Sequence, residues 1–485
     1  MGIDDRIFEK EKIGKLLLRF ALPAIISLLV QELYAMVDTV YAGRFIGSDA
    51  IAALTVAFPI QRLLISLGLL IAVGGSTCVS MSLGKGDRET AGKTAASSIV
   101  MGAATLTITV AICGVFLKPM LFRLGASSAT YPMASAYVAI ILAGGVFQAI
   151  TAIACYIMTV LGDSKVTLQA NSLGAILNII VDGVLIAGFG MGIEGAAIAT
   201  VASQIAAFVF AIIRFRKAKK YLKISFSPRS LRPSLSIKAM GVIIATGFSS
   251  FIIEVSDALS STVLNNVLLY KGGDDAITLL GTVTKISMFM YITIIGISSA
   301  MQPIVAYNFG AGNMDRVRKT VKTTLKAVLS SSMVMWTGLM IMAPYAIGIF
   351  LTDEALKSQA VPAFRIAISA IPLAGVCYVA LYYLQSVKQL GKSLMLSLSR
   401  MVILFIPISF VLTMVMGVTG TWISYPICDL IAAVMGYITM RKLLSRNVIV
   451  TEENTIERVP ELDRRPQGRL SRNYSFRPGR LEAVP

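Results

Sequence analysis

The dominant pattern in this chain is a repeated run of apolar residues long enough to cross a lipid bilayer. A membrane-spanning helix needs about 20 apolar residues in succession with few charges. Such stretches lie near residues 16–42, 51–83, 92–117, 130–160, 166–188, 193–213, 237–269, 276–306, 318–344, 358–387, 393–416 and 420–440. The pattern therefore predicts an all-α integral membrane protein with twelve transmembrane helices.

The amino-acid composition supports this interpretation. Of the 485 residues, 56% are hydrophobic and only 14% are charged, whereas soluble domains carry about 25% charged residues. The first stretch is too long for a cleavable signal peptide, and it contains Glu32 and Asp38. We therefore expect it to remain as the first transmembrane helix.

The formal net charge of +18 is spread over alternate loops. Basic residues concentrate in the N-terminal segment and in every second loop, most densely between the sixth and seventh stretches. This is the positive-inside pattern, and the central basic loop would face anionic lipid rather than nucleic acid. It predicts a multi-pass protein of the bacterial cytoplasmic (inner) membrane with both termini in the cytoplasm.

The sequence lacks the residues that several classes of function require. There is no histidine, so proton transfer would run through carboxylates, and a histidine-ligated metal site is excluded. The five cysteines show no CxxC spacing. The sequence also lacks a nucleophile–base pair, a nucleotide-binding glycine loop and a channel filter motif. We expect a protein that is not an enzyme, needs no cofactor and uses no ATP.

The chain contains an internal repeat. DAIAAL at Asp49–Leu54 recurs as DAITLL at Asp275–Leu280, an offset of 226 residues. Glycines in the loops that follow show the same offset, pairing Gly84 and Gly86 with Gly310 and Gly312. Because each repeat holds six spans, the two halves share one orientation and should be related by a pseudo-two-fold axis along the membrane normal.

The repeat and the composition divide the chain into five parts. LGDSK at Leu161–Lys165 resembles LGKS at Leu390–Ser393, at the junctions of spans 4–5 and 10–11. The expected parts are an N-terminal cytoplasmic segment (1–12), a first lobe (13–213), a cytoplasmic linker (214–236), a second lobe (237–445) and a disordered cytoplasmic tail (446–485).

Acidic residues inside the predicted spans are few. An ionised side chain at the bilayer centre costs about 2.5–3.5 kcal/mol, so each one needs a partner or a wet cavity. Asn178 and Asp182 are spaced i, i+4 on one face of the fifth span. With Asp38 on the first span and oxygens of Thr200 and Gln204 on the sixth, they could bind Na⁺, or a proton on a buried carboxylate. The alternative is that Asn178 and Asp182 only form hydrogen bonds between helices.

The second half holds a possible second acidic site. Glu254 and Asp257 are spaced i, i+3 on the seventh span. Lys285 and Arg400 on neighbouring spans could neutralise them, so a structural ion pair and a role in transport both stay open. Asp429 on the last span is interpreted as structural.

Residues on the first and eighth spans are candidates for a substrate cleft. The polar or aromatic candidates are Gln31, Glu32 and Tyr34. Met288 and Met290 could adapt to varied apolar ligands, although ordinary packing is the alternative for these methionines.

Several segments resemble the multidrug and toxic compound extrusion (MATE) family. The resemblance rests on LPAIISLLVQELYAMVDTVYAGRFIGSDAIAAL at Leu22–Leu54 and QPIVAYNFGAGNMDRVRK at Gln302–Lys319, supported by LGDSK, LNIIVDG and SRMVILFIPISF. It covers residues 13–445. Within the family, the chain looks most similar to the bacterial DinF/MepA-like branch.

The resemblance implies two six-helix lobes in a V around a central cleft, and drug export driven by inward flow of Na⁺ or H⁺. The family's cation site in the first lobe carries over to Asp38, Asn178, Asp182 and Thr200, and its helix-7 acid to Glu254. Residues 358–387 lack the acid that NorM-like members carry on helix 10. This departure favours the first lobe as the coupling site.

We therefore predict an antiporter that exports amphiphilic, mostly cationic compounds in exchange for H⁺ or Na⁺ and works as a monomer. The alternative is a flippase for lipid-linked precursors within the same superfamily. Such flippases have more spans and a cationic cleft, whereas basic residues deep inside these spans are few, namely Arg62, Lys285, Arg365 and Arg400.

Overall fold

The computed structural model describes residues 7–41, 45–46, 48–124, 126, 130–225, 237–351 and 354–445, and these residues are almost entirely helical. Eleven helices in this part of the chain are long and apolar enough to cross a membrane, and a pair bent by 42° supplies a twelfth crossing if counted as one span. The predicted all-α membrane fold is confirmed. The chain divides into two units, Met1–Asn447 and Val448–Pro485; the second unit and the whole predicted tail at 446–485 lie outside the described residues.

The first lobe follows a short N-terminal helix, α1 (Ile7–Lys10). Its helices are α2 (Ile13–Tyr41), α3 (Ser48–Gly84), α4 (Arg88–Val115), α5 (Leu117–Arg123), α6 (Tyr131–Val160), α7 (Val166–Asp182), the π-helix η2 (Gly183–Gly188) and α8 (Gly192–Tyr221). The helix α8 runs to Tyr221, so the expected linker at 214–236 begins as a continuation of the last helix of this lobe.

The second lobe begins with the longest element of the chain. Its helices are α10 (Ile237–Gly310), α11 (Met314–Gly348), α12 (Glu354–Ile368), α13 (Ile371–Ser386), α14 (Leu390–Leu398), the π-helix η3 (Ser399–Phe405), α15 (Ile406–Met416) and α16 (Val418–Ser445). Gly273 has a φ of 64°, which glycine adopts at no steric cost, and it separates α10 into a first arm (237–272) and a second arm (Asp275–Gly310).

The predicted tenth span at 358–387 is a broken element. It consists of α12 and α13, which are bent by 42° at Ser369 and Ala370. Pro372 lies at the start of α13, and a proline ring clashes with the preceding turn and removes a hydrogen-bond donor. The sequence therefore predicted the crossing but not the two-part path that it takes.

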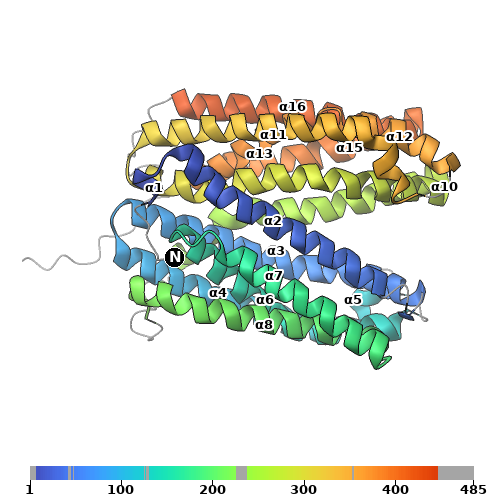
Figure 1. The fold of residues 1–485 in the computed structure, drawn as a ribbon, viewed down its shortest axis with the longest axis horizontal. Helices are drawn as coiled ribbons and strands as arrows, with labels where there is room; N and C mark the ends of the chain where they lie inside the picture. The colour runs from blue at the N-terminus through green and yellow to red at the C-terminus, as the bar shows by residue number, and fades with distance from the viewer. Residues whose placement is uncertain are drawn as a thin grey trace, which may run out of the picture. The chain divides into compact units, whose positions relative to one another are not determined.

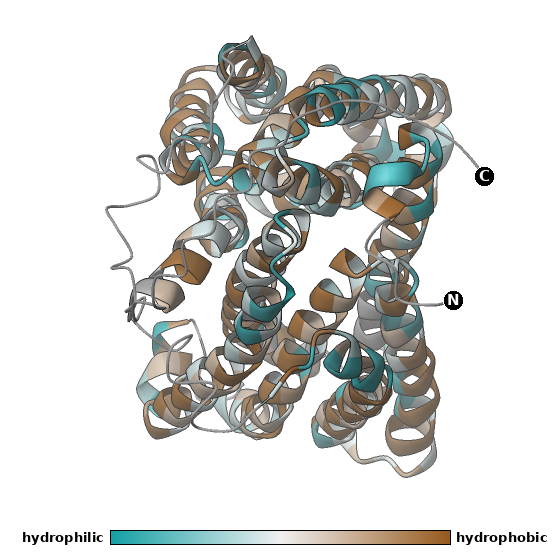
Figure 2. Cartoon of the chain, turned by 90° about the vertical axis from the view of Figure 1, so that its left-hand side faces the viewer, coloured by the Kyte–Doolittle hydropathy of each residue, from teal (hydrophilic) through white to brown (hydrophobic). Residues whose placement is uncertain are grey.

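Figure 1 shows the helices of the first half, coloured blue to green, beside those of the second half, coloured yellow to red. Within the first lobe, α3, α4 and α8 all pack on α6, and α7 packs on α2 and α8. The two lobes meet where α10 packs on α2 and α3. Figure 2 looks along the helices from the end that carries α1, and hydrophilic residues gather at the helix ends nearest the viewer.

The short helix α1 packs against both lobes, because the Phe8 ring lies 5.5 Å from the ring of Phe20 on α2 and 5.4 Å from that of Tyr307 on α10. The Phe8 side chain is completely buried, and its carbonyl oxygen accepts hydrogen bonds from Asn308 Nδ2 (3.1 Å) and Arg316 Nε (2.6 Å). Tyr307 Oη donates to Glu9 Oε1 (2.9 Å). The N-terminal segment is therefore attached at the junction of α10 and α11.

The loops that follow α3 and α10 have the same backbone geometry, as the 226-residue offset predicts. Gly86 and Gly312 both have positive φ, at 78° and 74°. The next residues, Asp87 and Asn313, cap α4 and α11, and each side chain accepts a hydrogen bond from the amide three residues on. At Asp87 the hydrogen bonds from Thr90 lower the pKa of the carboxyl.

The first glycines of the same loops form a reciprocal contact between the lobes. A Cβ atom at Gly84 would overlap the carbonyl oxygen of Tyr307, and one at Gly310 would overlap that of Met81. Met81 and Tyr307 are themselves separated by the same offset. The two backbones therefore touch across the pseudo-two-fold axis, and only glycine fits there.

The turns after α6 and α13 correct the offset between LGDSK and LGKS in the sequence comparison. The turn after α6 places Gly162 at φ 94°, and the turn after α13 places Lys388 at φ 55°. In both turns the next residue, Asp163 or Gln389, donates its amide to the carbonyl oxygen five residues back. The structural offset therefore stays at 226, and the match of LGDSK with LGKS is shifted by three residues.

Alanine at the glycine contact should destabilise the protein. Gly84→Ala and Gly310→Ala should each lower the free energy of unfolding by about 1–3 kcal/mol, because the added methyl overpacks two touching backbones. Gly338→Ala on α11 is the control, since nothing lies within 4 Å of a Cβ there. The melting temperature of the purified protein in detergent measures the effect. Equal values for the Gly84 and Gly338 variants would contradict the close contact.

Candidate functional site

Two polar side chains are completely buried inside the first lobe. Asn178 and Asp182, one turn apart on α7, are both 0% exposed. The amide nitrogen and oxygen of Asn178 have no hydrogen-bond partner among the described residues. A buried amide without partners is costly, so this position is suited to a bound ion or water that supplies them.

The helix changes its geometry directly after Asp182. Residues Gly183–Gly188 form a π-helix, a deviation that is frequent at functional sites. A Cβ at Gly183 would lie 3.3 Å from Tyr41 Oη of α2, so the end of α2 reaches this point of α7. Asp38 lies three residues before Tyr41 on α2, but its side chain is outside the described part of the structure.

The third helix of the predicted site is α8, which packs on α7. Thr200 is buried, with 6% of its surface exposed, and its hydroxyl donates to the carbonyl of Ala196 (3.0 Å). The hydroxyl oxygen keeps lone pairs that can accept or coordinate. The Nε2 of Gln204 donates to Gln148 Oε1 of α6 (3.3 Å), and its Oε1 is buried without a hydrogen-bond partner among the described residues. The interpretation of Gln204 as an oxygen donor near Thr200 stays a prediction.

Glu254 pairs with a residue of the opposite lobe. Arg62 Nη1 on α3 lies 3.1 Å from Glu254 Oε2 on the first arm of α10. Sequence reasoning offered Lys285 or Arg400 as partners and missed Arg62. The only available signal was a basic residue in the middle of an apolar stretch, which marks a functional or paired position without naming its partner.

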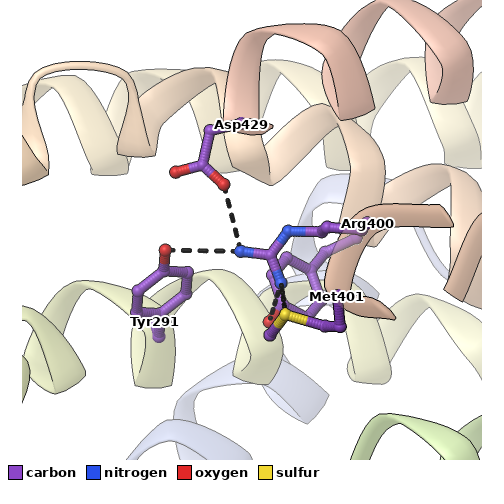
Figure 3. Close-up of polar contacts among 5 residues, drawn as sticks. Tyr291, Arg400, Met401 and Asp429 are labelled. Atoms are coloured by element: carbon purple, nitrogen blue, oxygen red, sulfur yellow. Dashed lines mark hydrogen bonds and ion pairs between the residues drawn. The ribbon is translucent and has the colours of Figure 1, made fainter. Parts of the chain in front are cut away.

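Arg400 instead belongs to a buried network inside the second lobe (Figure 3). Its guanidinium lies 3.1 Å from Asp429 Oδ1 and donates to Tyr378 Oη (3.1 Å) and Tyr291 Oη (3.3 Å). It also lies 4.9 Å from the centroid of the Tyr378 ring. Asp429 therefore pairs with Arg400 inside the second lobe, and its structural role stays a prediction.

The remaining candidates, which are the proposed cleft residues and Asp257, differ in how exposed their side chains are. Gln31, Glu32 and Met288 are partly exposed, whereas Met290 is completely buried in the packed interior. The backbones of Tyr34 and Asp257 lie in α2 and α10, but their side chains are outside the described part of the structure.

The fold and its polar residues can now be set against known proteins. The MatE family model matches residues 23–184 and 246–411, one block in each lobe. The chain belongs to the MATE family. Its relatives include the multidrug export protein MepA of Staphylococcus aureus, 26% identical over 447 residues, which cover 92% of this chain and 97% of the relative.

Two further comparisons agree with this assignment. The MepA protein of Staphylococcus saprophyticus is 28% identical over 446 residues, covering 90% of this chain and 96% of the relative. A solved structure described as the outward-facing conformation of a multidrug resistance MATE family transporter of the MOP superfamily superposes with a TM-score of 0.86 at 21% identity. That match covers 92% of this MATE chain and 99% of the solved one.

Removing one charge of the Arg400–Asp429 pair should cost more stability than removing both charges. Arg400→Met and Asp429→Leu should each lower the free energy of unfolding by about 3–5 kcal/mol, because each leaves one charge buried without its partner. The double variant should recover most of the loss. Thermal unfolding in detergent checks this expectation, and a double variant no more stable than either single one would contradict it.

Proposed function

We propose that this MATE transporter exports amphiphilic, mostly cationic drugs in exchange for H⁺ or Na⁺. The coupling site is the first-lobe group of Asp38, Asn178, Asp182 and Thr200. The observation that carries the proposal is the complete burial of Asn178 and Asp182, with the amide of Asn178 lacking a hydrogen-bond partner among the described residues.

Ion exchange explains why such groups are kept in the interior. A buried carboxylate changes its interactions strongly when it gains a proton or a cation, because the low dielectric magnifies charge effects. An ion that binds one conformation better than the other shifts the population toward that conformation. A drug that favours the opposite conformation is then moved outward as the ion moves inward.

The orientation follows from the basic residues. The end of the bundle that carries α1 also holds the loops after α3 and α10 and the end of α8, which are rich in lysine and arginine. By the positive-inside rule this end faces the cytoplasm of a bacterial cell. Export of several drugs is supported by the names of the relatives, which are multidrug export proteins.

The flippase alternative requires a cationic cleft. Two of the basic residues in the spans are neutralised in the described structure, because Arg62 pairs with Glu254 and Arg400 with Asp429. This pairing favours export of cations over transport of polyanionic lipid precursors.

Removing charge from the coupling site should abolish export. Asp38→Asn and Asp182→Asn should each reduce ethidium efflux to the background of cells without the transporter, because neither variant can gain or lose the coupling charge. Asp315→Asn is the matched control, since its side chain is 85% exposed. Normal membrane levels of each variant must be shown by immunoblot. Ethidium efflux by Asp38→Asn at the rate of the unmodified protein would contradict this mechanism.

The coupling ion can be identified by imposing one gradient at a time. In proteoliposomes, drug movement should respond to a Na⁺ gradient or to a pH gradient, and Asp182→Asn should remove that response. Drug movement that follows neither gradient would contradict ion coupling.

A further inference from the structure

The pair of Arg62 and Glu254 joins the two lobes near the middle of the membrane. Arg62 lies within α3 and Glu254 within the first arm of α10, each more than ten residues from either end of its helix or arm. Their side chains are 37% and 26% exposed, so neither is enclosed in the packed interior. Since the proposed export moves a substrate between the lobes, a partly exposed ion pair that joins them is within reach of that substrate.

An aromatic ring of the first lobe lies beside this pair, and two tyrosines, one from each lobe, interact electrostatically with Glu254. The guanidinium of Arg62 lies 4.9 Å from the centroid of the Phe58 ring, which is itself 46% exposed. Tyr156 of α6 and Tyr382 of α13 are both partly exposed, and the charge of Glu254 acts on both phenol groups. A carboxylate among aromatic rings is the arrangement that recognises organic cations.

The guanidinium of Arg62 shares the binding chemistry of an organic cation. It is a delocalised, weakly hydrated cation that stacks on an aromatic ring while it binds a carboxylate. Arg62 therefore occupies the position that the charge of an amphiphilic cation would take. Because it is tethered to α3, it is always available to compete.

We propose that Arg62 is a specificity-determining residue, a built-in cation that holds Glu254 in the empty transporter and that an organic cation must displace. This inference rests on the proposed export of organic cations and names the residue that limits their affinity. The apparent affinity for a cation falls with the fraction of transporters in which Glu254 is free. Displacement also leaves Arg62 beside the bound cation, and like charges favour later release.

Binding of two ions of the same shape and opposite charge tests the proposal. Tetraphenylphosphonium and tetraphenylborate are measured by equilibrium dialysis on the full chain in detergent, after subtraction of protein-free micelles. Arg62→Gln should bind the phosphonium at least about threefold more tightly, as expected when a partly exposed ion pair no longer competes. The same variant should bind the borate more weakly, whereas Arg62→Lys, which keeps the charge, should resemble the original protein.

Two further variants separate competition from a structural effect. When Glu254 is already replaced by Gln (Glu254→Gln), the further change Arg62→Gln should no longer raise the affinity for the phosphonium. No carboxylate is then left for which the two cations could compete. Arg214→Gln breaks another partly buried pair, with Asp163 at 2.7 Å inside the first lobe, and should leave both affinities unchanged.

Three results would overturn the proposal: equal changes for both ions in Arg62→Gln, the same gain in the Glu254→Gln background, or no phosphonium binding by Arg62→Gln. Equal changes would mean that the pair acts as a lock between the lobes rather than as a competitor. The assay needs no ion gradient, so a failure of ion coupling in the transport experiments would leave its outcome readable.

Discussion

Hydrocarbon offers no hydrogen bonds to a polar side chain, and this constraint organises the interior of the whole structure. Arg400 and Asp429 satisfy it by pairing within one lobe, and Arg62 and Glu254 satisfy it by pairing between lobes. Asn178 differs from them, since its completely buried amide has no hydrogen-bond partner for either its nitrogen or its oxygen among the described residues. The buried pair of Arg400 and Asp429 therefore belongs to the scaffold of this transporter, whereas the amide of Asn178 can still take a ligand, as a candidate ion site requires.

The spans and the repeated loops could be predicted from the sequence because both depend on local signals. Apolar runs mark the crossings, and the glycines at Gly86 and Gly312 mark turns that need positive φ. The partner of Glu254 could not be predicted, because Arg62 lies 192 residues away and their contact depends on how the lobes pack. Aligning LGDSK with LGKS by residue identity gave an offset three residues too large. The turn is defined by its backbone geometry, and Lys388 occupies the position of Gly162 in it. Asp38 and Asp257 stay predictions, because their side chains lie outside the described part of the structure.

The two lobes share a scaffold but differ in chemistry. The offset of 226 places Leu404 and Ile408 opposite Asn178 and Asp182, so the second lobe is apolar where the first carries its candidate site. Its own buried charges are tied together at Arg400, on the π-helix η3. Both equivalent helices thus contain a π-helical segment, and in the first lobe it directly follows a helix that carries a fully buried carboxylate and amide. An ion bound there would act on one lobe alone.

The glycine contact between α3 and α10 has the form of an isologous interface. Gly84 meets Tyr307 and Gly310 meets Met81, just as a residue and its contact exchange roles in a two-fold symmetric homodimer. The two halves of this chain are therefore arranged like two subunits that happen to be covalently joined. Consequently the contact surfaces of the two halves can themselves specify how the halves are placed against each other, as they do in a dimer.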